Sequence, residues 1–360
     1  MRNAQRFFAA ALSAALLMSA AFAAETPQRV ERGNLVMEGI PEIPAELSER
    51  LNRYQQVRAA GFSGWLPDGS ALISTRFGET AQIHRVEKPM GARTQLTFYP
   101  EPIGGALPHP NKNGFVFSKD SGGNEFFQYY WFDLAAGEAK LLTDGKSRNT
   151  GAVFARDGSR LAFSTTQRNG KDIDIHLVAL DGKPSTPVLE KEGAWTALDF
   201  SPDGKTLLVL RSVSITESEL YTLDLASKVL TRFHATKEPV FFGGALFSHD
   251  GKKVYFTSDE GTEFRMLRVQ PLAGGGEKNL SATVPWNIED FTLTEDGSKL
   301  AYLSNEEGLA ALYLLDLKTG KAIATPKIPV GQIDHIAFDA SGQRLGFSID
   351  RATNPSDVYA

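Results

Sequence analysis

The sequence of 360 residues contains no cysteine. Disulfide bonds and thiolate chemistry are therefore excluded, and stability must come from a non-covalent core. Lys and Arg form no basic run, and the net charge of −5 arises from both signs interspersed along the chain. A nucleic-acid partner is not expected from this pattern. Beyond the first 23 residues, no apolar run is long enough to cross a membrane.

The one extended apolar segment lies at the N-terminus. Arg2 and Arg6 flank its start, the stretch from Phe7 to Ala20 is apolar, and residues 21–23 (Ala-Phe-Ala) fit the small-x-small cleavage rule. We predict a signal peptide over residues 1–23, cleaved after Ala23, and hence a secreted, periplasmic protein. The alternative is an uncleaved membrane anchor, but this run is shorter than the roughly 20 residues that a span needs.

Motifs for catalysis and metal binding are also missing. No G-x-S-x-G nucleophile elbow occurs, since the segment GFSGW at 61–65 has Trp65 in place of the second glycine. No H-E-x-x-H motif occurs, and the six scattered histidines are predicted to be packing residues. The segment DSGGNE at 120–125 lacks the alternating oxygen ligands of a calcium loop. We therefore predict no catalytic residue, no metal site and no cofactor in this chain.

What the sequence does have is a repeat. Apolar runs meet at turns of the Asp-Gly or Asn-Gly type, which favour tight hairpins because glycine tolerates positive φ angles. The steps between successive turn glycines are 45, 44, 46, 47, 46 and 45 residues. A period near 45 with several short strands per unit is typical of a β-propeller with one blade per repeat. The turn glycines are Gly69, Gly114, Gly158, Gly204, Gly251, Gly297 and Gly342.

The predicted fold class is all-β, a seven-bladed β-propeller with four strands per blade. In the repeat at 194–239, the four strands are expected over 194–201, 205–212, 219–227 and 228–236. Second strands are almost continuously apolar, as in strands packed on both faces. Large first-strand side chains should fill the space between blades: Trp65, Trp195, Phe200 and Phe247. The predicted repeats cover residues 61–103, 104–149, 150–193, 194–239, 240–285, 286–331 and 332–360.

The two ends of the predicted propeller differ from its middle. In the N-terminal extension at 24–60, Leu47, Leu51 and Tyr54 follow Pro44 at helical spacing, which predicts a short amphipathic helix. Residues 34–37 could form a strand. The seventh repeat stops in its third strand at Ala360, so the last blade is expected to be incomplete. Either the N-terminal strand completes it, or the chain is a truncated part of a longer protein.

Several stretches resemble the propeller of a bacterial prolyl oligopeptidase family serine peptidase, in particular its acylaminoacyl-peptidase or dipeptidyl-peptidase-like branch. They are NLVMEGIPEIPAEL, RYQQVRAAGFSGWLPDG, ISTRFGETAQIHRVEKPMGARTQLTFYPEPI and KDSGGNEFFQYYWFDL, and the resemblance extends over residues 24–360. Its most specific part is the first-blade segment, which contains Arg76, Gln82, His84, Arg93, Gln95, Leu96 and Thr97.

The resemblance implies a two-domain hydrolase in which the propeller covers a C-terminal α/β-hydrolase domain with a Ser/Asp/His triad. That domain is absent from this sequence, so the chain alone is expected to be an inactive fragment that gates and binds peptide substrates for the missing half. Loops that face the active site in this family correspond here to TRFGET and KDSGGNE. The implied substrate-binding residues are Arg76, Glu79, Asp120, Asn124 and Glu125, although solvated loop charges with a folding role are an open alternative.

Two other kinds of propeller protein share part of this pattern. A TolB-like periplasmic scaffold that binds partner proteins shares such repeats, but it carries a sizeable α/β domain before the propeller, whereas here only residues 24–60 precede the first repeat. A lactonase-like propeller enzyme would need inward-pointing metal ligands, and no such set is evident.

Overall fold

The computed structural model describes residues 28–33 and 35–360, so the predicted signal peptide and its cleavage site at Ala23 lie outside the described residues. The chain forms two units, which divide between Val57 and Arg58. Within the described ranges, no helix is both long and apolar enough to cross a membrane.

The N-terminal unit contains a hairpin and a helix. Strand β1 (Arg29–Arg32) pairs antiparallel with β2 (Leu35–Glu38), and helix α2 (Ala45–Gln55) follows Pro44. The predicted helix and the predicted strand near 34–37 are therefore both present. No side chain of α2 is buried, and Leu47, Leu51 and Tyr54 are exposed.

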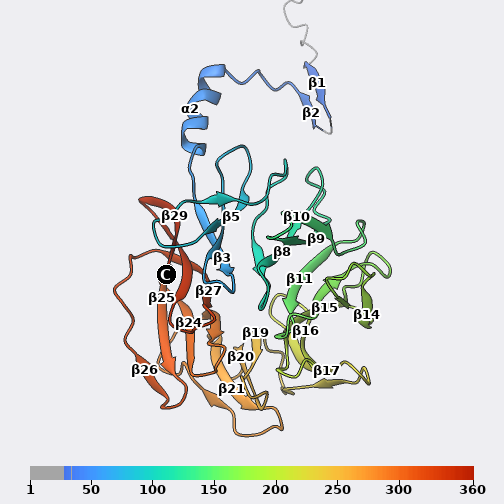
Figure 1. Ribbon diagram of the computed structural model, residues 1–360, viewed down its shortest axis with the longest axis vertical. Helices are drawn as coiled ribbons and strands as arrows, with labels where there is room; N and C mark the ends of the chain where they lie inside the picture. The colour runs from blue at the N-terminus through green and yellow to red at the C-terminus, as the bar shows by residue number, and fades with distance from the viewer. Residues whose placement is uncertain (1–27, 34) are drawn as a thin grey trace, which may run out of the picture. The chain divides into compact units, whose positions relative to one another are not determined.

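The second unit consists of seven antiparallel sheets arranged in a ring (Figure 1), which confirms the predicted all-β, seven-bladed β-propeller. Six sheets have four strands, and the seventh, β27-β28-β29, has three among the described residues.

The first strands are β3 (Ala60–Trp65), β7 (Ala106–Pro108), β11 (Asn149–Phe154), β15 (Ala194–Phe200), β19 (Phe242–Phe247), β23 (Ile288–Leu293) and β27 (Gln332–Phe338). The second strands are β4 (Ala71–Thr75), β8 (Gly114–Lys119), β12 (Leu161–Thr165), β16 (Thr206–Ser212), β20 (Lys253–Ser258), β24 (Lys299–Glu306) and β28 (Leu345–Arg351). The third strands are β5 (Gln82–Val86), β9 (Gln128–Asp133), β13 (Asp174–Val178), β17 (Ser218–Asp224), β21 (Met266–Pro271), β25 (Leu309–Asp316) and β29 (Asn354–Tyr359). The fourth strands are β6 (Thr94–Gln95), β10 (Glu138–Leu141), β14 (Thr186–Leu189), β18 (Leu230–Arg232), β22 (Lys278–Asn279) and β26 (Lys321–Ile323).

Strand order divides the connections between two faces of the ring. Each sheet is antiparallel and follows chain order, so its first-to-second and third-to-fourth turns lie at one end of the strands. The second-to-third loops and the links between sheets lie at the other end. We call these the turn face and the loop face. All the Asp-Gly turns therefore lie on one face, as the repeat predicted.

The repeated turn owes its shape to glycine and to a preceding hydroxyl. Gly204 has a φ of 67°, and Ser201 Oγ donates to Asp203 Oδ1 at 2.7 Å while accepting the Thr206 N–H at 2.9 Å. The expectation of positive φ fails at one turn, because Gly114 is not among the glycines with positive φ. There the glycine lies outside the turn, as the first residue of β8, and it is required for space, since a Cβ would overlap the Trp131 ring.

The core lies between neighbouring blades. On β16, Leu207 and Val209 pack with residues of the third blade, whereas Leu208 packs with residues of the fifth. Both faces of a second strand are therefore buried, which explains its continuous apolar sequence. The predicted space-filling role of Trp195, Phe200 and Phe247 is confirmed, because each is buried in one of these clusters.

The first and seventh blades close the ring directly. The Phe62 N–H donates to Ser348 Oγ at 2.6 Å, and Trp65 Nε1–H donates to the Ala337 carbonyl at 3.0 Å. The Arg344 guanidinium lies 4.4 Å from the centre of the Trp65 ring. The strand at 35–38 pairs with β1 and not with the seventh sheet, so this closure does not use it.

Candidate functional site

The loop face carries most of the exposed large apolar side chains of the propeller. Eight of them lie in or beside second-to-third loops and links between blades, against three on the turn face, Met90, Val229 and Leu272. Since a solvated surface has no need for such a gathering, the loop face is the better candidate for contact with another domain or molecule. The eight are Phe77, Phe98, Phe126, Leu141, Val213, Ile215, Leu309 and Val330.

The five predicted substrate-binding residues all lie on this loop face. Arg76 and Glu79 belong to the loop between β4 and β5, and the other three belong to the loop between β8 and β9 in the next blade. Arg76 is partly buried and Glu79 is exposed. Their substrate-binding role stays a prediction.

In the second of these loops, two of the predicted residues shape the backbone. Asp120 is buried, and its Oδ2 accepts the Glu125 N–H at 2.9 Å. Asn124 Oδ1 accepts the Phe126 N–H at 2.9 Å. These bonds hold Glu125 at a φ of 61°, with its side chain 72 % exposed and 3.8 Å from Arg148. Glu125 therefore presents its carboxylate to solvent, whereas the side-chain oxygens of Asp120 and Asn124 accept loop N–H groups, which favours the folding role for these two.

The central channel opens on the turn face into a cavity of about 440 Å³. Its wall is formed by the ends of first strands and by the turns that follow them, and it includes Trp65, Phe247 and Phe338. The wall also contains polar and charged side chains, among them Arg156 and Asp199, which lie 3.9 Å apart.

Two carboxyl groups on first strands have raised pKa values because they are buried. Burial raises the pKa of Asp199 to about 7, against the opposing effect of the hydrogen bond from the Phe247 N–H at 2.8 Å and of the Arg156 charge. Burial also raises the pKa of Asp290, whose Oδ2 accepts the Ile336 N–H at 3.3 Å. In each pair the N–H belongs to the first strand of the next blade, so these carboxyls join neighbouring blades around the channel.

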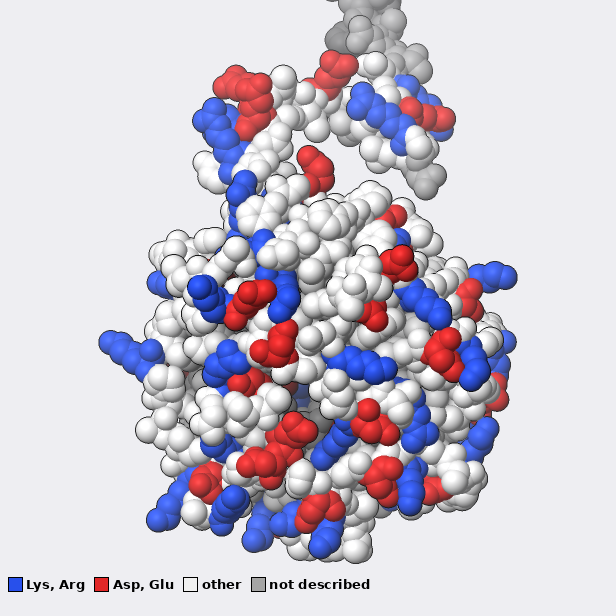
Figure 2. All heavy atoms as spheres, in the orientation of Figure 1, with Lys and Arg blue, Asp and Glu red and all other residues white. Residues whose placement is uncertain are grey.

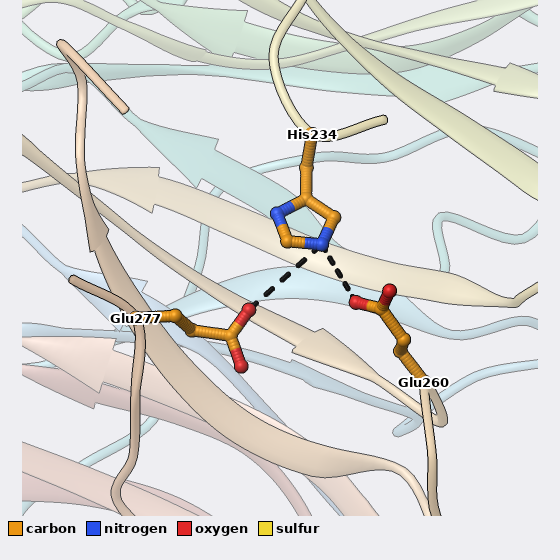
Figure 3. Close-up of side chains that lie close together, drawn as sticks. All are labelled: His234, Glu260 and Glu277. Atoms are coloured by element: carbon orange, nitrogen blue, oxygen red, sulfur yellow. Dashed lines mark hydrogen bonds and ion pairs between the residues drawn. The ribbon is translucent and has the colours of Figure 1, made fainter. Parts of the chain in front are cut away.

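One group of ligand-type side chains lies away from both the channel and the predicted residues. His234, Glu260 and Glu277 meet at the outer edge of the fourth and fifth blades (Figure 3). The sequence contained no signal for them, because their spacings of 26 and 17 residues match no metal motif and only the packing of two blades brings them together. For His234, the prediction of a simple packing residue is therefore incomplete.

Charge does not single out a site on the face that Figure 2 shows, where Lys and Arg are interspersed with Asp and Glu without a large patch of one sign. The absence of a nucleic-acid partner stays a prediction from the sequence.

Comparison with known proteins identifies the kind of propeller. No family model matches the chain. The chain is 23 % identical over 313 residues to dipeptidyl-peptidase 5 of Porphyromonas gingivalis, a match that covers 82 % of this chain and 44 % of that protein. The chain thus spans less than half the length of this curated relative.

Solved structures support the same fold. The structure of a prolyl endopeptidase aligns with 94 % of this chain over 58 % of its own length, with a TM-score of 0.69 at 14 % identity. A putative TolB from Agrobacterium tumefaciens matches 64 % of this chain with a TM-score of 0.52 at 17 % identity, over 83 % of its own length. These findings confirm the predicted resemblance: the chain is similar to the propeller portion of prolyl oligopeptidase family peptidases.

Proposed function

We propose that this chain is the propeller of an exported prolyl oligopeptidase family serine peptidase, and that its loop face covers a catalytic α/β-hydrolase domain. This proposal rests on the exposed apolar side chains that gather on the loop face. A second domain that covers this face would remove these side chains from water. The match to a peptidase, of which it covers only 44 %, supports the same view. In this role the propeller restricts access, so that peptides reach the active site and folded proteins do not.

Within this function, Arg76 and Glu125 are the proposed substrate contacts. Both lie on loops of the loop face in adjacent blades, and Glu125 is held at an exposed position by the Asp120 bond. A carboxylate there can bind the amino end of a peptide, and a guanidinium can bind its carbonyl or carboxylate oxygens. Glu79, Asp120 and Asn124 are assigned to the surrounding loop structure.

The first experiment is to read the DNA beyond codon 360 in all frames. A stretch coding for G-x-S-x-G within a strand–turn–helix pattern is expected. The longer product should react with a fluorophosphonate serine probe and cleave short peptides but not a folded protein. Absence of any such coding stretch would contradict the proposed function.

The second experiment tests the loop face itself in that longer product. Phe77→Asp with Phe126→Asp should loosen the contact between domains and lower peptidase activity. The matched control is Met90→Asp with Leu272→Asp, which places the same charges on the turn face. Equal losses in the two double variants would show that the loop face has no special role.

A further inference from the structure

The group formed by His234, Glu260 and Glu277 joins two blades at their outer edge. His234 follows β18, the outermost strand of the fourth blade. Glu260 lies in the loop between β20 and β21 of the fifth blade, and Glu277 directly precedes β22. Figure 3 shows the three side chains pointing toward one another from these separate segments.

The geometry places electron-pair donors face to face. His234 Nε2 lies 2.6 Å from Glu260 Oε2 and 3.8 Å from Glu277 Oε2. The other ring nitrogen, Nδ1, lies 2.6 Å from Gln270 Oε1, and a proton on Nδ1 satisfies that contact. With the proton on Nδ1, Nε2 presents a lone pair to the carboxylate oxygens, and a second proton or a metal ion can be shared between them.

Buried partners fix the orientation of these donors. Arg268 is buried, and its guanidinium binds Glu277 Oε1 and the Glu260 carbonyl oxygen. Gln270, which receives Nδ1–H, is also buried. Metal-bound histidines and carboxylates are typically held in this way by a second set of hydrogen bonds, which leaves one donor atom of each free to bind the ion.

Charge and exposure are also suited to an ion. The two carboxylates and the Arg268 guanidinium leave a net charge of −1 when the imidazole is neutral, so a divalent cation is favoured. The side chains of His234, Glu260 and Glu277 are 14 %, 33 % and 25 % exposed, so an ion can enter from solvent. One nitrogen and two oxygen donors suit first-row divalent metals such as Zn²⁺, with the remaining positions open to water.

We propose that His234, Glu260 and Glu277 form a divalent metal site that fastens the fourth blade to the fifth. The proposal does not rest on the peptidase role, because the site contains none of the proposed substrate contacts. Its occupation stabilises the propeller by mass action, since only the folded ring brings the three ligands together.

The test is titration of Zn²⁺ into chelator-treated, tag-free chain at pH 8, where free imidazole is deprotonated, followed by calorimetry and by thermal unfolding. One Zn²⁺ per chain and a rise in melting temperature are expected. His234→Ala and the isosteric Glu277→Gln should each weaken binding at least tenfold and abolish the rise in melting temperature. Glu263→Gln, an exposed carboxylate in the same loop as Glu260, is the matched control and should bind normally.

Two results would overturn the proposal. One is an absence of stoichiometric Zn²⁺ binding by the unaltered chain, which would identify the group as a proton-bridged ion-pair network only. The other is binding that Glu277→Gln leaves intact, which would place the ion elsewhere. Because Glu277→Gln keeps the size of the side chain, circular dichroism of this variant separates a lost ligand from a lost fold if His234→Ala does not fold.

Discussion

Ring closure depends on a buried hydrogen bond between residues 286 positions apart in the chain. The Phe62 N–H on β3 donates to Ser348 Oγ on β28 at 2.6 Å, and both residues are buried. Ser348→Ala removes the acceptor but almost none of the volume. It leaves a backbone N–H without a partner at the junction of the first and seventh blades.

The expected cost follows from that unsatisfied group. A buried donor that loses its acceptor costs about 1–3 kcal/mol of unfolding free energy, which corresponds to a fall of roughly 2–6 °C in melting temperature for a domain of this size. The matched control is Ser356→Ala on β29, where a partly buried hydroxyl donates to the Ala60 carbonyl at 3.1 Å. Water can replace that donor, so the expected cost is smaller, below about 1 kcal/mol.

The measurement is urea unfolding followed by tryptophan fluorescence, with Trp65 as a reporter at the junction of the first and seventh blades. The midpoint should fall for Ser348→Ala with an unchanged slope, because the folded state stays equally compact. A loss for Ser348→Ala no greater than for Ser356→Ala would refute the argument that this bond is important for closing the ring.

Three further predictions concern the same junction, the channel and the chemistry of the chain. Gly346→Ala should destabilise the protein by about 1–3 kcal/mol, because its Cβ would lie 2.8 Å from two atoms of the buried Phe62 ring, whereas Gly61→Ala, with open space at its Cβ, should be nearly neutral in the same urea assay. The free energy of unfolding of the Asp199→Asn variant, measured at each pH, should increase relative to that of the unaltered protein as pH rises from about 4 to about 7. The folded state binds the Asp199 proton more tightly than the unfolded state, with a pKa of about 7 against 3.8, so the native carboxyl loses stability over that window; an unchanged difference would argue against the raised pKa. The chain of residues 24–360 should hydrolyse no peptide or ester above background, and its labelling by a fluorophosphonate probe would disprove this expectation.

Much of the fold could be predicted because the propeller repeats its local rules. The turn glycines recur with the blade period, and Leu207, Leu208 and Val209 show by their unbroken apolar run that both faces of β16 are buried. The exception at Gly114 is instructive. It is the first residue of β8, where its role is to leave space for Trp131, and sequence alone cannot distinguish that need from a need for positive φ.

The candidate sites were harder to predict because their residues do not repeat. Asp120 and Glu125 were identified through a family resemblance, and only the structure shows that one carboxylate folds the loop while the other is exposed. Asp199 and Asp290 acquire their raised pKa values from burial against the next blade, which has no local signature. His234 meets Glu260 only because two blades stack at their outer edges.

The same contrast between repeated and unrepeated parts distinguishes the two faces of the propeller. Turn-face hairpins repeat a nearly constant Asp-Gly motif, so they are committed to holding first and second strands together. The second-to-third loops range from residues 307–308 in the sixth blade to residues 120–127 and 166–173 in the second and third, and their sequences do not repeat. A loop that need not serve the blade is free to serve recognition, since its sequence can change without altering the sheet beneath it. Exposed apolar side chains gather on the face with these unrepeated loops, and this coincidence is the physical reason for proposing that face as the one that meets a partner domain and a substrate.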